Sequence, residues 1–406
     1  MDDRASLGVA VIGAGMAGRA HAAGYRAAST IYDAGLPAVR LVAIADVNPD
    51  FAADAARRYG YQRAETSWQA VAEAPDVDVV SVVVANALHR EIVEGLLAAG
   101  KHVLCEKPLA ASIADAEAMA AAARASGRQA AVGFTFRWSP AIAAIREQLR
   151  QGRVGRPLHF SGAYWCDYGC DPGRPMSWRY KGGAGSGALA DIGSHLLDLA
   201  EFVCGPVQSV AGALLTTVIS ERPLPLAAAV GHRAVPVSDV REPVENEDIA
   251  TFTARFASGA AGTFSVSRVA FGLPNSLTFQ VFAERGAASF DLARAGELGF
   301  ADASPPGATQ GFRQVLLGPA HPYLAGGLPM DFPGVGYGQN DLFTFQARAF
   351  LEQVAGLERL PRPASFEDGL HSLHLLDAVV ASARSGGAEV AVTPAAEPVA
   401  ERGERG

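Results

Sequence analysis

The sequence predicts a two-domain α/β protein, and three observations support this. Short continuous apolar runs alternate with helical stretches in the first third of the chain, as a parallel sheet covered on both faces requires. A glycine-rich turn follows the first run, and the apolar period changes to two beyond residue 250. We therefore expect a doubly wound domain over 1–137, an α+β domain with a large, mainly antiparallel sheet over 138–393, and a disordered tail over 394–406.

Composition limits the class of protein. The 406 residues include 49% apolar and 19% charged residues, and the formal net charge is -8. An acidic surface does not attract the phosphates of nucleic acid or of anionic lipid, so neither is expected as a partner. We find no signal peptide and no apolar stretch of about 18 residues. Together with four irregularly spaced cysteines, this predicts a cytoplasmic protein.

The predicted parallel strands are five apolar runs. They are Val9–Ile12, Arg40–Ala45, Val77–Val84, His102–Cys105 and Ala130–Gly133. The stretch from Ile113 to Ser126 is rich in alanine and is predicted as a helix. Gly127 follows it, where a helix end favours a residue that tolerates positive φ.

The second domain is predicted to open with a helix, because Ser139 can cap it and Pro140 suits its first position. Beyond it, strict alternation of apolar and polar residues predicts an antiparallel sheet with one packed face. The predicted strands are 251–256 and 262–267, which a hairpin turn joins, and 277–281. Two helices are predicted after them, over 341–354 and 366–385. Residues 301–340 are rich in glycine and proline and predict a long functional loop. The exposed sheet face predicts a homo-oligomer, a dimer or a tetramer.

A dinucleotide site is predicted at the turn after the first strand. Gly13, Gly15 and Gly18 complete a G-x-G-x-x-G pattern. The first glycine permits the tight turn, the second lets the backbone approach a pyrophosphate, and the third lets helix pack on strand. Met16 and Ala17 open the helix, whose free N–H groups face the phosphates. The first domain is thus predicted to be a Rossmann domain, with a merely flexible glycine loop as the alternative.

The cofactor is predicted to be NAD rather than NADP. Asp46 ends the second strand, where a carboxylate binds the ribose hydroxyls and repels a 2′-phosphate. Asp46 lies 28 residues beyond Gly18, more than the usual spacing of about 20. We assign the extra length to a loop insertion within 29–39. The alternative is an aspartate that caps the following helix.

Lys107, Asp191 and His195 are the candidate catalytic residues. Lys107 follows a buried strand at the sheet edge that faces the ligand crevice, and Pro108 holds it in extended geometry. Asp191 and His195 are four residues apart in a predicted helix and share one face. Histidine is a natural general base for a hydroxyl proton, and the aspartate can orient it or bind substrate. The alternatives are a surface lysine, a capping aspartate and a buried, satisfied histidine.

No metal site is predicted. Cys166 and Cys170 lie near Asp167 and Asp171, a set that could bind a cation. No further histidine or cysteine follows at the spacing that zinc ligands require.

Taken together, the glycine turn, Glu106-Lys107-Pro108 and the glycine-rich segment ending in Asp191 and His195 resemble the glucose–fructose oxidoreductase / inositol dehydrogenase (Gfo/Idh/MocA) family. The resemblance covers residues 8–393 and includes Asn86–His89 and Phe366–Leu370. It implies an NAD-dependent oxidoreductase that interconverts a secondary hydroxyl and a ketone on a sugar, glycoside, anhydrosugar or cyclitol, with Lys107, Asp191 and His195 at the reacting hydroxyl. The implied cofactor contacts are Gly13, Gly15, Met16, Ala17, Gly18, Asp46, Asn86, His89, Glu106 and Lys107.

Three segments, Ser177–Arg179, Gly318–Tyr323 and Gly336–Gly338, resemble the branch of the family that oxidises the 3-hydroxyl of glucosides and anhydrosugars. The implied substrate contacts are Arg137, Tyr164, Asp167, Arg179, Asp191, His195 and Tyr337. Val84–Asn86 and Thr135–Arg137 depart from the family's usual Thr-Pro-Asn and Asn-Tyr-Arg, which leaves the identity of the sugar open. Three alternatives stay open: a biosynthetic ketosugar reductase, an NAD-dependent glycosidase without net redox, and a non-catalytic dinucleotide sensor.

Overall fold

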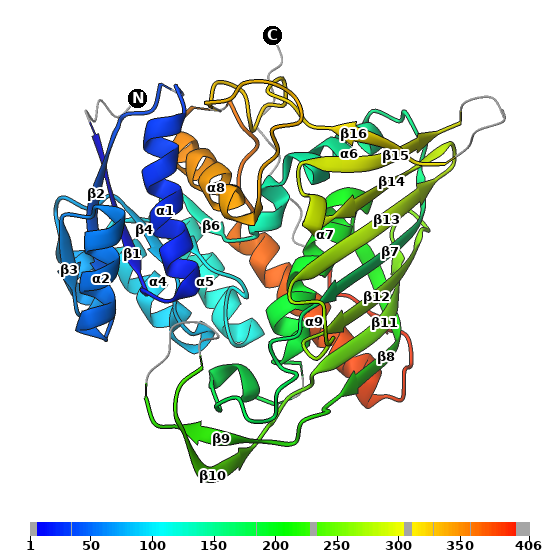
Figure 1. The fold of residues 1–406 in the computed structure, drawn as a ribbon, viewed down its shortest axis with the longest axis horizontal. Helices are drawn as coiled ribbons and strands as arrows, with labels where there is room; N and C mark the ends of the chain where they lie inside the picture. The colour runs from blue at the N-terminus through cyan, green and yellow to red at the C-terminus, as the bar shows by residue number, and fades with distance from the viewer. Residues whose placement is uncertain are drawn as a thin grey trace.

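A computed structural model describes residues 6–33, 35–183, 185–227, 234–303, 311–327, 329–357 and 359–394. Apart from residue 394, the predicted tail lies outside these residues. The chain folds into a Rossmann domain beside a domain built on a large sheet (Figure 1). The predicted fold class is confirmed.

The first domain is a six-stranded parallel sheet in the order β3-β2-β1-β4-β5-β6. Its strands are β1 (Ser6–Ile12), β2 (Ala38–Ala45), β3 (Arg63–Glu65), β4 (Val79–Val82), β5 (His102–Cys105) and β6 (Ala130–Val132). Its helices are α1 (Met16–Ile31), α2 (Pro49–Tyr59), α3 (Trp68–Glu73), α4 (His89–Ala98) and α5 (Ile113–Ser126). The strand order reverses between β1 and β4, and this switch point opens the crevice in which such sheets bind ligands. The expected insertion over 29–39 is shorter than predicted, because α1 continues to Ile31 and β2 begins at Ala38.

The second domain contains a nine-stranded sheet in the order β16-β15-β14-β13-β7-β12-β11-β8-β17. Its strands are β7 (Pro157–Trp165), β8 (Val207–Thr216), β11 (Ile249–Phe256), β12 (Ala261–Ser267), β13 (Ser276–Ala283), β14 (Gly286–Asp291), β15 (Glu297–Asp302), β16 (Arg313–Leu316) and β17 (Val390–Ala391). A separate pair, β9 (Glu221–Pro225) and β10 (Val237–Pro243), is antiparallel. In the large sheet β7 and β12 pair in parallel, and the other described pairs are antiparallel. The prediction of one long loop over 301–340 is wrong in two places. Residues 301–302 belong to β15, and residues 313–316 form β16, which pairs with β15 at the sheet edge.

Four longer helices complete the second half: α6 (Pro140–Arg150), α7 (Ser194–Cys204), α8 (Gln339–Val354) and α9 (Phe366–Arg384). α8 lies beside α1 of the Rossmann domain (Figure 1), and a Cβ at Gly24 would come within 2.7 Å of the carbonyl oxygen of Phe343. The amide of Val132 in β6 donates to the carbonyl of Ala364 at 2.8 Å. The chain therefore returns to its first domain after building the second.

One face of the large sheet packs against helices, and α7 and α9 lie along it (Figure 1). At the centre of this face Phe160 is fully buried, and its ring stacks on those of Phe264 and Phe279 at centroid distances of 5.4 and 5.5 Å. The residues that alternate with them point to the opposite face, which no described helix covers. The sheet thus has one packed face and one open face, as the alternation predicted.

We expect Phe160→Ala to lower the free energy of unfolding by about 3–5 kcal/mol, because it removes the centre of the aromatic stack and leaves a cavity. Denaturant unfolding followed by far-UV circular dichroism would measure it. The control is Phe282→Ala, which removes a ring that is 37% exposed on the open face and should cost about 1 kcal/mol or less. Equal losses in the two variants would contradict the assignment of the packed face.

Candidate active site

The glycine turn between β1 and α1 has the shape that a pyrophosphate needs. A Cβ at Gly13 would come within 2.0 Å of the carbonyl oxygen of Val83, and one at Gly18 within 1.8 Å of that of Gly13. Gly15, by contrast, faces open space and caps α1 without any side-chain hydrogen bond to the first amides. The turn therefore leaves both room and free N–H groups for a phosphate.

Asp46 lies at the end of β2, beside this turn. Its Oδ2 accepts a hydrogen bond from Ala14 N at 2.7 Å, and its Oδ1 accepts one from Asn48 N at 2.8 Å. The cap of α2 is Asn48, whose side chain accepts from the amides of Asp50 and Phe51. The alternative of a helix-capping Asp46 is thus wrong, because Asn48 caps α2 and the Asp46 carboxylate instead binds the glycine turn through Ala14 N.

Asp191 of the second domain meets Lys107 of the first. Lys107 follows β5, and its Nζ donates to the main-chain oxygen of Asp191 at 2.5 Å and lies 3.3 Å from Oδ1. The hydroxyl of Tyr168 donates to Oδ2 at 2.7 Å, and Arg179 Nε lies 3.8 Å from the same oxygen. The Asp191 carboxylate therefore lies between the two domains with an ammonium, a phenol hydroxyl and a guanidinium around it.

The helix that carries Asp191 begins earlier than expected. Leu189–Gly193 form one π-helical turn, which continues directly into α7 at Ser194. Such turns place side chains off the usual helical register and are frequent at functional sites. Asp191 therefore belongs to the π turn, while His195 belongs to the regular helix.

His195 lies next to Lys107 and Asp191, and its ring packs edge-on against Phe136 at a centroid distance of 4.9 Å. Its Nδ1 is buried and has no hydrogen-bond partner among the described residues. Burial lowers the pKa of His195 well below its usual value, the charge of Lys107 lowers it further, and Asp191 opposes both. The imidazole is consequently neutral near pH 7 and can accept a proton.

Glu106 supports Lys107 from the Rossmann side. Its Oε1 lies 2.8 Å from Nε2 of His21, and its Oε2 accepts from the amide of Lys107 at 3.1 Å. Burial alone would raise the pKa of Glu106, but His21 and the charge of Lys107 outweigh it and hold that pKa below its usual value. The Glu106 carboxylate is therefore ionised, directly after the last residue of β5.

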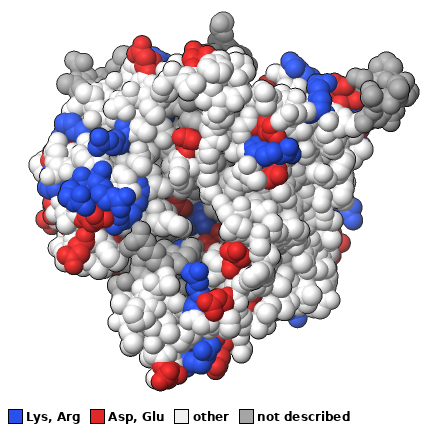
Figure 2. Space-filling view, in the orientation of Figure 1, with Lys and Arg blue, Asp and Glu red and all other residues white. Residues whose placement is uncertain are grey.

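In the space-filling view a hollow separates the two domains, and side chains of both charges are visible within it (Figure 2). Among the described residues, no helix has the length and apolar character to cross a membrane. No cluster of three or more potential metal ligands occurs among them either.

Comparison with known proteins decides the family. The family described as "Oxidoreductase family, NAD-binding Rossmann fold" (GFO_IDH_MocA) matches residues 7–134, and its C-terminal domain matches 142–289. Levoglucosan dehydrogenase of Pseudarthrobacter phenanthrenivorans is 38% identical over 93% of this chain and 96% of its own length. The chain belongs to the Gfo/Idh/MocA oxidoreductase family. It is accordingly an NAD-dependent oxidoreductase, as the resemblance implied.

Solved structures of this family agree. A levoglucosan dehydrogenase in complex with NADH and levoglucosan superposes with a TM-score of 0.85 at 35% identity and covers 96% of this chain and 99% of its own. An oxidoreductase domain protein from Kribbella flavida gives 0.85 at 36% identity, covering 96% of this chain and all of its own. A relative found by sequence, the inositol 2-dehydrogenase of Acidothermus cellulolyticus, is 33% identical over 51% of this chain and 57% of its own length.

Two further residues predicted to bind substrate, Tyr164 and Asp167, lie near the group formed by Lys107, Asp191 and His195. Tyr164 lies beside His195 at a ring distance of 6.3 Å, and its hydroxyl is 3.0 Å from Asn275 Oδ1. Asp167 adjoins Cys166, a buried thiol close to Asp191. Asn86 opens a 3₁₀ turn in the connection between β4, which ends at Val82, and α4.

Three predicted contacts are engaged elsewhere in the described structure. Both ring nitrogens of His89 face main-chain carbonyls, Leu109 O at 3.0 Å and Val84 O at 3.1 Å. Arg137 forms a buried ion pair with Asp198 at 2.6 Å. The hydroxyl of Tyr337 accepts from Ala141 N at 2.9 Å. These side chains support the loops around the crevice, and their contact with a ligand stays a prediction.

Three residues at the site escaped the sequence analysis: His21 behind Glu106, Phe136 against His195, and Tyr168 on Asp191. His21 lies in α1 and Tyr168 just beyond β7, so neither is close in sequence to its partner. Phe136 was noted only as a departure from the family pattern. Only tertiary contacts identify such partners.

We expect Asp46→Asn to narrow the preference for NADH over NADPH by about tenfold, roughly 1.4 kcal/mol, because it removes the charge that repels a 2′-phosphate while keeping one acceptor oxygen. Fluorescence titration with the two reduced cofactors would measure both dissociation constants. Asp50→Asn is the matched control, since Asp50 lies exposed in the first turn of α2. An unchanged preference in Asp46→Asn would remove this residue from cofactor selection.

Proposed function

We propose that this oxidoreductase oxidises a secondary hydroxyl of a glucoside-like or anhydrosugar ring to a ketone with NAD, and reduces the ketone in the reverse direction. The observation that carries the proposal is the convergence of Lys107, Asp191 and neutral His195 between the two domains. The likeness to levoglucosan dehydrogenase over nearly the whole length of both chains supports the choice of ring.

In this mechanism the substrate hydroxyl lies between Lys107 and His195. His195 accepts the hydroxyl proton as general base, since its imidazole is neutral. The Lys107 ammonium, held by Asp191, donates a hydrogen bond to the developing alkoxide and stabilises its charge. The glycine turn and Asp46 would hold NAD, which would supply the hydride acceptor for the carbon that bears this hydroxyl. Tyr168 keeps the Asp191 carboxylate turned toward Lys107.

Arg179 and Trp178 are proposed to receive the rest of the sugar. The Trp178 ring is 51% exposed, and the Arg179 guanidinium stacks over it at 4.5 Å. An exposed aromatic face suits the C–H side of a sugar ring, while a guanidinium donates to hydroxyls. Arg179 also faces Asp191, so this platform borders the proposed reacting centre.

A panel of glucosides, anhydrosugars, aminosugars and inositols, each with NAD, would test the proposal. Net NADH formation, followed by nicotinamide absorbance, is the expected result. Glycoside cleavage without net NADH would favour the glycosidase alternative. Tight NAD binding without turnover of any compound would favour the sensor. Faster turnover of a ketosugar with NADH than of any alcohol with NAD would favour the biosynthetic reductase.

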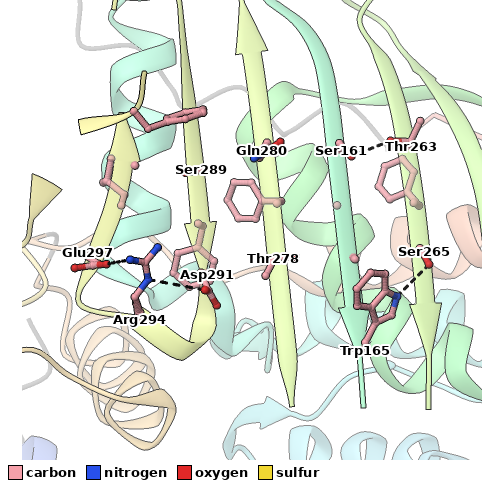
Figure 3. A pocket seen from close by; sticks show the side chains of 18 of the residues that line it. Ser161, Trp165, Thr263, Ser265, Thr278, Gln280, Ser289, Asp291, Arg294 and Glu297 are labelled. Atoms are coloured by element: carbon pink, nitrogen blue, oxygen red, sulfur yellow. Dashed lines mark hydrogen bonds and ion pairs between the residues drawn. The ribbon is translucent and has the colours of Figure 1, made fainter. Parts of the chain in front are cut away.

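We also propose that the protein acts in the cytoplasm as a homo-oligomer, a dimer or a tetramer, that forms through the open face of the large sheet. Ser161, Thr263 and Gln280 extend from this face, and the side chains of Arg294 and Glu297 form an ion pair at its border (Figure 3). Its concavity contains none of the predicted site residues, so a second copy could cover it without blocking the crevice. Light scattering with Thr263→Arg would test this, since a charge there should separate the subunits.

We expect Lys107→Ala to retain NADH binding within about threefold and to lose turnover by two orders of magnitude or more, because the removed ammonium serves the alkoxide. Steady-state rates on the best substrate of the panel and NADH titration would measure the two effects. The control is Lys181→Ala: Lys181 is a half-exposed lysine before Asp191 whose ion pairs are with Glu242 and Glu245, and the variant should keep near wild-type rates. Wild-type turnover in Lys107→Ala would exclude the lysine from the mechanism.

The pH profile of kcat/KM for oxidation should not fall at the usual pKa of histidine. A lowered pKa means that the neutral, proton-accepting form of His195 persists as the pH drops below 6.5. We therefore expect the acidic limb to lie well below pH 6.5, with re-assay at neutral pH as the control for inactivation. A limb centred at or above pH 6.5 would contradict His195 as a neutral buried base.

A further inference from the structure

Three consecutive polar residues are buried immediately before β11. Asn246, Glu247 and Asp248 are 1%, 2% and 0% exposed. Side chains of this kind are seldom buried without partners, because desolvation of a polar or charged group is costly. What they bind is therefore informative.

Glu247 binds the glycine-rich loop that leads to the π turn. Its Oε1 accepts from the amides of Gly187 at 3.0 Å and Leu189 at 2.9 Å, and its Oε2 accepts from Gly185 N at 2.7 Å. Its main-chain oxygen accepts from Ala188 N at 3.0 Å, and a Cβ at Gly187 would come within 2.2 Å of that oxygen. One carboxylate thus fixes three amides through charge-assisted hydrogen bonds.

Asn246 fixes the other end of the same loop. Its Nδ2 donates to the carbonyl oxygens of Arg179 and Lys181, each at 3.0 Å. Arg268, fully buried, donates to the same Arg179 oxygen at 2.9 Å and to Asn246 Oδ1 at 2.8 Å. Its Nε lies 2.7 Å from Asp248 Oδ1, so the cation is paired as well.

The two fixed ends carry two residues that face the proposed reacting centre. Asp191 follows Leu189 by two positions and holds Lys107, and Arg179 lies 3.8 Å from the Asp191 carboxylate. The network holds Arg179 by its main-chain oxygen and holds the segment before Asp191 by the amides of Gly187 and Leu189. It acts on them through the backbone.

We propose that Glu247, with Asn246 beside it, is a positioning residue of the enzyme: it holds segments 179–183 and 185–191 so that Asp191 meets Lys107 and Arg179 faces Asp191 in catalytic geometry. The proposal deepens the proposed function and rests on it for its kinetic readout. A displacement of about 1 Å at a reacting group can cost about a hundredfold in rate, so the loss of this carboxylate should appear in turnover.

Glu245 offers a matched control two residues away. It binds the same loop, since its Oε2 accepts from Gly182 N at 2.9 Å and its Oε1 lies 3.1 Å from Lys181 Nζ. Its side chain is 46% exposed, and its contacts lie at the outer part of the loop. Glu245→Gln therefore loses a loop contact and a charge without touching the segment that leads to Asp191.

The experiment compares wild type, Glu247→Gln and Glu245→Gln as full chains. In Glu247→Gln an amide NH₂ replaces one acceptor and must face a backbone N–H. Turnover is normalised to NADH-binding sites, so that only folded enzyme is counted. We expect Glu247→Gln to lower kcat per site at least about tenfold, with KM for NAD within twofold, and Glu245→Gln to stay within twofold in both. If Glu247→Gln yields no NADH sites, Glu247→Asp replaces it and should give an intermediate kcat.

Hydrogen–deuterium exchange of the NADH-bound proteins provides a second readout that needs no substrate. We expect faster exchange in the peptide spanning 185–193 in Glu247→Gln and unchanged exchange in Glu245→Gln. Wild-type kcat per site in Glu247→Gln, equal losses in both variants, or unchanged exchange over 185–193 would overturn the positioning role. If the wild type itself oxidises nothing in the panel, the proposed function fails, and the exchange data alone decide whether Glu247 holds the loop.

Discussion

The contact between Lys107 and Asp191 is the interaction on which the site depends. It joins the end of β5 in the Rossmann domain to a π turn in the second domain. In the proposed mechanism neither partner suffices alone, because the ammonium needs a fixed anion to hold its direction and the substrate hydroxyl needs the neighbouring imidazole. Other residues hold each partner in place. Glu106, itself bound to His21, binds the amide of Lys107. Tyr168 binds the Asp191 carboxylate, and Glu247 holds the loop that precedes it.

Lys107 and His195 have different charges at the proposed reacting centre, and their electrostatic interaction maintains that difference. The cation of Lys107 and the surrounding apolar rings disfavour a second positive charge, which keeps His195 neutral. In the proposed mechanism the lysine charge stabilises an oxyanion, while the neutral imidazole remains free to take a proton. Asp191 lies 3.3 Å from the lysine ammonium and 3.8 Å from Arg179, so its charge offsets part of the positive charge in the pocket.

The sequence alone predicted the features that local patterns encode. The glycine turn, the strand that leads to Lys107 and the helix that carries His195 follow from periodicity and from residues with special backbone freedom. Family resemblance added the grouping of Lys107, Asp191 and His195. The supporting residues could not be found in this way, because Tyr168, His21 and Glu247 reach their partners across the fold and share no spacing with them. The π turn was missed for a related reason: it depends on a loop anchored by a distant carboxylate, while the local sequence favours an ordinary helix. Strand β16 was missed because glycine and proline dominate its neighbourhood, and only pairing with β15 makes it extended.

The return of the chain to its first domain has a consequence for biosynthesis. The last strand of the Rossmann sheet ends at Val132, yet the amide of Val132 donates a hydrogen bond to the carbonyl of Ala364, and α1 packs against α8 at Gly24. A ribosome releases those C-terminal partners only after every strand of the large sheet except β17 has emerged. The nascent N-terminal half must therefore wait with an apolar helix face uncovered, and final consolidation of the nucleotide-binding half becomes one of the last events in making the protein.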